Sequence, residues 1–147
     1  TVFHVVGFCE QEYENKLRSL EKKGIIKFHG KLEDVREIYK ISHCIIHPSY
    51  YSEGMSNVLL ESAASGRPII TTDRSGCREI VDDSISGYIV KKKNSIDLIE
   101  KIEKFLSLSY CKKIEMGLAG RKKVENKFDR KLVVNAYLEE ILKVLYN

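Results

Sequence analysis

The sequence lacks any apolar run that approaches the roughly 18 residues needed to cross a bilayer. Among its 147 residues are only two prolines and nine glycines, and a content of 43% hydrophobic and 31% charged residues is typical of a soluble globular protein. The beginning, TVFHVVGFCE, has no basic leader, cleavage pattern or initiator methionine, so we expect a fragment of a longer protein and no signal peptide. No linker is visible, and we predict a single domain over residues 1–147.

The four cysteines form no CxxC pair, and their spacing is not that of metal ligands. Cys44 lies in the apolar run HCIIH, where a free cysteine behaves as a small core residue. We therefore expect no metal and a reducing, cytoplasmic compartment.

Motifs typical of nucleic-acid binding, such as zinc fingers and RNP-like aromatic runs, are also absent, so we expect no nucleic-acid partner. The net charge is +4, with 25 Lys and Arg against 21 Asp and Glu, and much of the excess lies in the runs KKK at 91–93 and RKK at 121–123. Two interpretations of these runs remain open. They are solvated ends of helices and loops, or they attract phosphate or an anionic membrane surface.

Short β-rich runs alternate with amphipathic stretches along the whole chain. The pattern predicts strands at 2–6, 25–28, 43–47, 68–72 and 87–90. It predicts helices at 10–23, 33–40 and about 56–65, a helical turn at 78–81, and helices from 94 onward that end with one at 132–145. This order, with continuous apolar strands, predicts an α/β fold: a three-layer α/β/α, Rossmann-like domain with a parallel sheet.

In such a fold, ligands bind beyond the carboxyl ends of the strands. Loops with suitable residues follow the first three predicted strands, and we expect them to converge on one edge of the sheet. They contain Gly7 and Phe8; Gly30, Lys31 and Leu32; and residues 49–56. In the third loop, the amides around Gly54, Met55 and Ser56 open a helix, where we expect unpaired donors and about half a positive charge to favour a phosphate.

Two glutamates bracket this helix start in the nonapeptide EGMSNVLLE, residues 53–61. Glu53 precedes the turn, and Glu61 lies about one turn into the helix, where it could accept hydrogen bonds from a diol. A ligand with a sugar, a phosphate and a ribose in a row would match this arrangement. The sugar would lie at Glu53, the phosphate at the amides of the helix start and the ribose at Glu61. The alternative stays open, because Glu53 could merely complement the helix dipole and Glu61 could be a surface residue.

The longer run SEGMSNVLLESAASGRPIITTDRSGCREIVDDSISGYIV resembles the signature region of the family-four glycosyltransferases, which are retaining enzymes of the GT-B fold. The family pattern of Glu, seven residues and Glu is matched by Glu53 and Glu61. It is followed by a Gly-x-Pro before a strand, a Gly-x-x-Glu turn at 76–79 and a Gly-hydrophobe strand at 87–90. VVGF, FHGKLEDVREIY and HPSYYSEG resemble the family too, so the likeness covers nearly the whole chain.

The resemblance implies that the chain is the C-terminal, donor-binding half of a glycosyltransferase that uses a nucleotide sugar, UDP-linked in our prediction, in bacterial surface polysaccharide assembly. It implies that Glu53 contacts the donor sugar as the catalytic residue and that Glu61 holds the ribose. The implied contacts to sugar hydroxyls and phosphate are Gly54, Met55, Ser56 and Asn57, and the implied nucleotide site includes Leu60, Gly30, Lys31, Leu32 and Phe8.

The chain departs from the family pattern at Met55 and Ser56, where many members have Phe and Gly. The Arg and Lys that clamp the diphosphate in the family would lie before Thr1, as would the domain that binds the acceptor glycan or lipid-linked sugar. We therefore expect the chain alone to be inactive. Alternatives are an idle nucleotide-binding or partner-binding module of the same fold and a sugar-nucleotide epimerase of the GT-B type. A receiver-like protein with Asp73 as phosphoacceptor would need an acidic pair where Gly7 and Phe8 stand.

We assign the last predicted helix to the core on its apolar spacing. In the family this segment crosses back to the other domain, so the resemblance implies partial exposure of Val133, Tyr137 and Leu138 when that domain is absent. The three histidines His4, His43 and His47 lie in or beside strands, and we expect them to be packed or hydrogen-bonded rather than catalytic.

Overall fold

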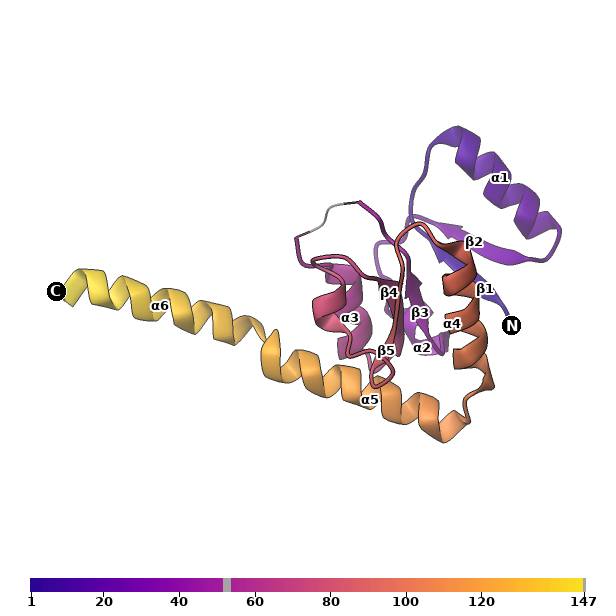
Figure 1. Ribbon diagram of the computed structural model, residues 1–147. Helices are drawn as coiled ribbons and strands as arrows, with labels where there is room; N and C mark the ends of the chain where they lie inside the picture. The colour runs from indigo at the N-terminus through magenta and orange to yellow at the C-terminus, as the bar shows by residue number, and fades with distance from the viewer. Residues whose placement is uncertain (52–53, 147) are drawn as a thin grey trace. The chain divides into compact units, whose positions relative to one another are not determined.

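The computed structural model describes residues 1–51 and 54–146, which form two compact units, Thr1–Ile41 and Ser42–Asn147. Helices and strands alternate along the chain as the sequence predicts, and Figure 1 labels them in order.

The smaller unit is a two-stranded parallel sheet joined by one crossover helix. Strand β1 (Phe3–Val6) pairs with β2 (Ile26–Gly30), with α1 (Gln11–Lys22) between them in sequence and α2 (Arg36–Ile41) after them. A parallel pair needs such a crossover because its strands cannot be joined by a tight turn. Glu21 Oε1 accepts a hydrogen bond of 2.8 Å from the amide of Phe28, which is buried, so the carboxylate ties the end of α1 to β2.

The larger unit contains a parallel sheet in the order β3-β4-β5. Its strands are β3 (Ile45–His47), β4 (Ile69–Thr72) and β5 (Gly87–Val90). Its helices are α3 (Asn57–Ala64), the short 3₁₀ helix η1 (Arg78–Ile80), α4 (Ser95–Ser107), α5 (Tyr110–Lys127) and α6 (Arg130–Tyr146).

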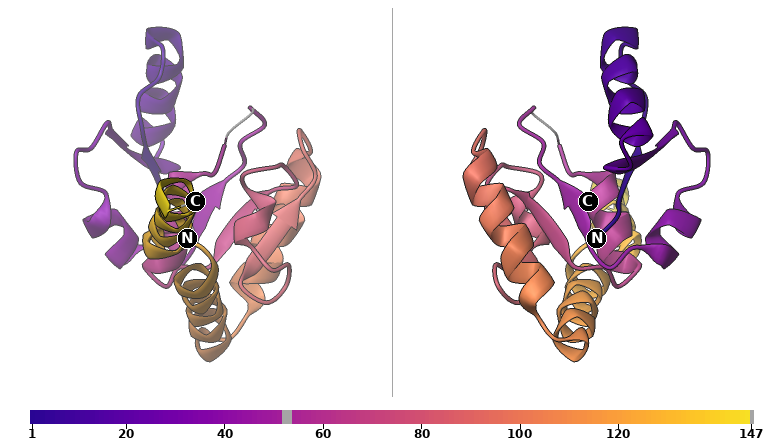
Figure 2. Two further views of the ribbon diagram at one scale, coloured as in Figure 1. Left: turned by 90° about the vertical axis from the view of Figure 1, so that its left-hand side faces the viewer. Right: turned by 90° about the vertical axis from the view of Figure 1, so that its right-hand side faces the viewer.

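This sheet lies between α3 and α4 (Figures 1 and 2). Buried side chains form a separate core on each side of it. Ile69 faces the side of α3, where Leu59 and Ala63 are fully buried. Ile70, the next residue of β4, packs on the opposite side with Phe105 of α4. Side chains alternate across a strand, so a strand with apolar residues on both faces needs a helix on each. The α/β class with parallel strands and three layers is thus confirmed.

Cys44 packs against the core on the α4 side, as predicted for a small core residue. Burial raises the pKa of its thiol to about 12, so the thiol stays protonated at neutral pH.

The last helix departs from the prediction of a core element. Each described residue of α6 is exposed, and its exposed large apolar side chains run from Leu132 to Tyr146. The expected exposure of Val133, Tyr137 and Leu138 is confirmed, with exposed fractions of 57%, 69% and 51%. Apolar spacing identified the helix correctly but could not show whether a partner surface covers it. Within residues 1–51 and 54–146, no helix is both long and apolar enough to span a membrane.

Two glycines permit close approaches of backbone in the larger unit. A Cβ atom at Gly87 would overlap the carbonyl oxygen of Ile69 on the neighbouring strand. A Cβ atom at Gly117, in the middle of α5, would overlap the carbonyl oxygen of Gly66 in the turn between α3 and β4. The glycine at 117 therefore allows α5 to pack directly against this turn.

We predict that Gly117→Ala lowers the free energy of unfolding by about 1–3 kcal/mol, because the added methyl group must push the helix away from the turn. Gly120→Ala on the same helix is the matched control. Its Cβ would lie 3.5 Å from the Cβ of Ser86, an ordinary contact, and alanine favours the helix by about 0.5–1 kcal/mol over glycine. Urea unfolding of the two variants measures the difference, and equal stabilities would contradict the packing account.

A pair of histidines links the strands of the smaller unit. His4 Nδ1 and His29 Nε2 lie 2.9 Å apart, and the rings stack with centroids 5.1 Å apart and an angle of 10° between planes. The expectation that His4 is hydrogen-bonded is confirmed. Desolvation lowers the pKa of His4, and the nearby His29 and Lys27 add to this effect.

This lowered pKa predicts that the smaller unit loses stability in mild acid. The unfolded chain takes up a proton on His4 more readily than the folded chain, so the contribution is fully present above about pH 6.5 and is lost as the pH falls below it. We expect hydrogen-exchange protection factors of β1 amides to fall between pH 7.5 and 5.5. His4→Leu should remove this pH dependence, whereas His43→Ala, at an exposed histidine of the other unit, should keep it. An unchanged pH profile in His4→Leu would refute the role of the pair.

Candidate functional site

The N-terminus of α3 lies directly after the loop that follows β3. The first helical hydrogen bond runs from the amide of Leu60 to the carbonyl of Ser56, at 3.1 Å. The amides of Asn57, Val58 and Leu59 therefore have no acceptor inside the helix, and the helix dipole adds about half a positive charge at this end. The predicted catalytic residue, Glu53, lies outside the described residues. Gly54, Met55 and Asn57 are exposed.

Ser56 differs from its prediction. Its amide donates a 3.0 Å hydrogen bond to the carbonyl of Gly76, and the residue is 4% exposed. The expectation of an unpaired amide is therefore wrong at Ser56. The physical reason is that the loop after β4 returns to the start of α3 and satisfies this donor with its own backbone.

The Gly-x-x-Glu turn that the sequence singled out supplies this contact. Gly76 has φ +86°, a left-handed conformation that favours glycine, and its amide donates a 2.8 Å hydrogen bond to Glu79 Oε2. The Arg78 guanidinium lies 3.0 Å from Asp73 Oδ1 and 3.4 Å from Glu79 Oε1, and Asp73 is the main cause of the raised pKa of Arg78. The turn thus contacts the start of α3 through the carbonyl of Gly76, and the Glu79 carboxylate holds the amide of the same glycine.

Leu60 and Glu61, both predicted to serve the nucleotide, line one cavity of about 320 Å³. It is formed by α3, the end of α5 and the following turn, and is lined by Leu60, Glu61, Ala64, Val124, Glu125, Phe128 and Asp129. The lining combines apolar side chains with three carboxylates, from Glu61, Glu125 and Asp129. Glu125 Oε1 lies 2.8 Å from Arg121 Nε, so part of this negative charge is compensated within the protein. Carboxylates in the lining suit hydroxyl groups, which donate hydrogen bonds to them.

A second cavity, of about 300 Å³, opens at the carboxyl ends of the strands β3, β4 and β5. It is lined by Pro48, Tyr50, Thr72, Val90, Lys91, Lys93, Asn94, Ser95 and Leu98. Lys93 Nζ lies 4.8 Å from the ring centroid of Tyr50, which also stacks on Tyr51. Our interpretation of the sequence did not place Lys91 to Ser95 at a cavity. The available signal was a basic run between a strand and an asparagine that caps a helix through its side chain.

The remaining predicted nucleotide residues belong to the smaller unit. The amide of Gly7 donates a 2.8 Å hydrogen bond to the carbonyl of Gly30, so the loops after β1 and β2 are joined. Phe8 is 87% exposed, Lys31 is exposed and Leu32 is half-buried. These positions leave the side chains of Phe8 and Lys31 accessible. Their nucleotide contacts, and the convergence of these loops with the loop after β3, stay predictions.

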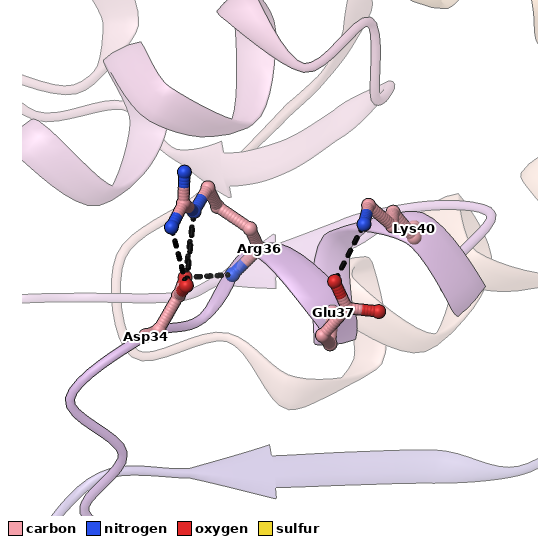
Figure 3. A network of polar contacts seen from close by, with 4 residues as sticks. All are labelled: Asp34, Arg36, Glu37 and Lys40. Carbon is pink, nitrogen blue, oxygen red and sulfur yellow. Dashed lines mark hydrogen bonds and ion pairs between the residues drawn. The ribbon is translucent and has the colours of Figure 1, made fainter.

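Asp34 lies between the loop after β2 and the start of α2, where it contacts Arg36 (Figure 3). Its carboxylate accepts hydrogen bonds of 2.9 Å from the Arg36 amide and 2.7–3.0 Å from the guanidinium, and the Arg36 side chain is the main reason that the pKa of Asp34 falls to about 2. One turn on, Glu37 pairs with Lys40 (Figure 3). These contacts order the start of α2 rather than form a site, since each side chain is well exposed and satisfied locally.

Comparison with known proteins places these observations in a family. A family model described as glycosyl transferases group 1 matches residues 1–123. The capsular polysaccharide biosynthesis glycosyltransferase CapM of Staphylococcus aureus is 32% identical over 116 residues, covering 79% of the chain and 29% of CapM.

Solved structures share the fold. A glycosyltransferase from Rickettsia africae matches with a TM-score of 0.87 and 25% identity, covering 100% of the chain and 41% of that structure. HepE of Anabaena in complex with UDP matches with a TM-score of 0.81 and 21% identity, covering 96% and 40%. The chain spans 31% and 32% of the length of the first curated relatives that it matches. Because the family model covers most of the chain, the chain belongs to the family of glycosyl transferases group 1.

Proposed function

We propose that this chain is the donor-binding half of a glycosyltransferase that transfers a sugar from a nucleotide sugar. The observation that carries the proposal is the start of α3, where the amides of Asn57, Val58 and Leu59 follow a parallel strand and have no acceptor inside the helix. Helix N-termini beyond the carboxyl ends of parallel strands are suited to phosphate groups. The match of the family model to residues 1–123 supports the assignment of the reaction class.

The proposed donor lies along α3, with its diphosphate at the helix start and its ribose at Glu61. The carboxylates that line the cavity beside Leu60 and Glu61 support a hydroxyl-bearing group there, since they accept hydrogen bonds from hydroxyls. Glu53, placed by the resemblance alone, faces the sugar. We propose UDP as the nucleotide, and the shared fold with HepE, whose structure holds UDP, is compatible with this choice.

In the proposed reaction, negative charge develops on the nucleoside diphosphate as it leaves. The amides and the dipole at the start of α3 stabilise that charge, and the reaction needs no metal ion. Glu53 orients the sugar rather than attacking it. Hydrolases that retain configuration use two carboxyl groups beside one bond, whereas the second acid here serves the ribose. An acceptor domain and a cationic pair before Thr1 complete the site in a longer, GT-B type protein that retains configuration.

We further propose a role in the assembly of a surface polysaccharide on the cytoplasmic side of a membrane. The name of CapM, a capsular polysaccharide enzyme 32% identical to the chain, supports the product class. The exposed Lys91, Lys92 and Lys93 offer positive charge for peripheral contact with an anionic lipid surface.

Calorimetric titration of the chain with UDP tests the donor site. We expect millimolar binding that Glu61→Ala weakens about ten-fold, because hydrogen bonds between a carboxylate and the ribose are lost. The variant should also bind UDP and its 2′-deoxy analogue equally, whereas the wild type prefers UDP. Glu115→Ala, which removes an exposed carboxylate paired with Lys112 on α5, is the matched control and should bind as the wild type does. Absence of binding to the wild type would refute the proposed function.

A second variant tests the proposed division between sugar and nucleotide. We expect Glu53→Ala to leave UDP binding almost intact and to abolish most sugar transfer by the full-length protein. An equal loss of UDP affinity in Glu53→Ala and Glu61→Ala would contradict this division. Full activity of the longer protein carrying Glu53→Ala would contradict the catalytic role, and an inactive wild type would favour an idle binding module.

A further inference from the structure

We propose that Glu79 is a positioning residue for the phosphate site at the start of α3. This inference rests on the proposed function, since it assigns a role at that same site. The turn that contains Glu79 is part of the resemblance, but neither the donor contacts nor the chemistry described above use it. The hydrogen bonds of this turn indicate a role for Glu79.

Glu79 and Ser56 together fix both polar backbone groups of Gly76. The amide of Gly76 donates to Glu79 Oε2 at 2.8 Å, and its carbonyl accepts from the amide of Ser56 at 3.0 Å. Gly76 has φ +86°, where a side chain would be strained. Without the Glu79 carboxylate, the peptide unit that contains the Gly76 amide could rotate. The carbonyl of Gly76 would then be held only by its hydrogen bond from the Ser56 amide.

The contact at Ser56 passes this orientation to the amide of Asn57, which has no acceptor inside the helix. The Ser56 amide is held by Gly76, and the Ser56 carbonyl is held by the amide of Leu60 at 3.1 Å. That carbonyl belongs to the same planar peptide unit as the amide of Asn57. Two bonds on Ser56 therefore aim the Asn57 amide, and the Ser56 hydroxyl makes no capping hydrogen bond of its own.

The turn is also anchored in the same core as α3. Cys77 and Ile80 are fully buried in a cluster with Leu59 and Ala63. The side chain of Glu79, in contrast, is 39% exposed, and its second oxygen faces Arg78 Nε at 3.4 Å. Removing the carboxylate therefore leaves the packed part of the turn intact, and the effect should be local.

Two accounts of Glu79 make opposite predictions. If Glu79 acts through the position of its acceptor, glutamine should replace it, because the amide oxygen can accept the same hydrogen bond. Aspartate should fail, since a side chain shorter by one methylene group draws the acceptor away from Gly76. If Glu79 acts through its charge, aspartate should replace it and glutamine should fail.

The test compares Glu79→Ala, Glu79→Asp and Glu79→Gln in the same chain, with Glu115→Ala as control. UDP and uridine are titrated into each, and amide exchange at Ser56 and Gly76 is followed without ligand. We expect Glu79→Ala and Glu79→Asp to bind UDP about three- to ten-fold more weakly, with unchanged affinity for uridine and faster exchange at both amides. Glu79→Gln and Glu115→Ala should match the wild type. If Glu79→Ala fails to fold, the comparison of Glu79→Asp with Glu79→Gln still distinguishes the two accounts of Glu79.

The possible failures can be told apart. A wild type that does not bind UDP overturns the proposed function, and the positioning role with it. A wild type that binds UDP, with unchanged affinity in Glu79→Ala or Glu79→Asp, overturns the positioning role alone. Equal losses for UDP and uridine would show a general structural effect, and a loss in Glu79→Gln with none in Glu79→Asp would show that charge is what matters.

Discussion

The larger unit depends on the burial of β4 on both of its faces. Each residue of Ile69–Thr72 is buried, so helices must cover the sheet on both sides, and polar groups at the strand's end must find partners within the protein. The hydroxyls of Thr71 and Thr72 donate to the carbonyls of His47 and Ser49, which lie at the end of β3 and just beyond it. The chain leaving β3 is therefore held against β4 as it enters the loop before α3. Because helices cover both faces of the sheet, backbone amides at the start of a helix are accessible to solvent at the ends of the strands.

The residues that carry the resemblance to glycosyltransferases have different structural roles. Gly87 permits a close approach of strands, and Gly66 is the backbone against which Gly117 packs. Hydrogen bonds through Gly76 connect Glu79 with Ser56 at the start of α3, whereas Leu60 and Glu61 line a cavity. A match to a family pattern therefore identifies residues that hold the scaffold as well as residues of a candidate site.

Much of the fold could be predicted because it is local. The alternation of strand and helix patterns, the start of α3 near Ser56 and the adjacency of Leu60 and Glu61 follow from residues close in sequence. The use of the Ser56 amide could not be predicted, because its acceptor, Gly76, is brought to it by a strand and two turns. The cavity around Lys93 was missed for the same reason, since its walls come from the loop after β3, the ends of β4 and β5, and α4 with the loop before it. Periodicity found α6 but could not show that it would be exposed, because burial depends on a partner surface.

The central claim is that the start of α3 receives a phosphate, and the most direct measurement is the response of individual amides to UDP. In a nitrogen–proton correlation spectrum, the account predicts that UDP shifts the amides of Asn57, Val58 and Leu59 most strongly. Uridine, which lacks phosphate, should leave them nearly unchanged. Equal shifts with uridine would contradict the claim, as would UDP shifts confined to the residues around Lys93 with none at these amides.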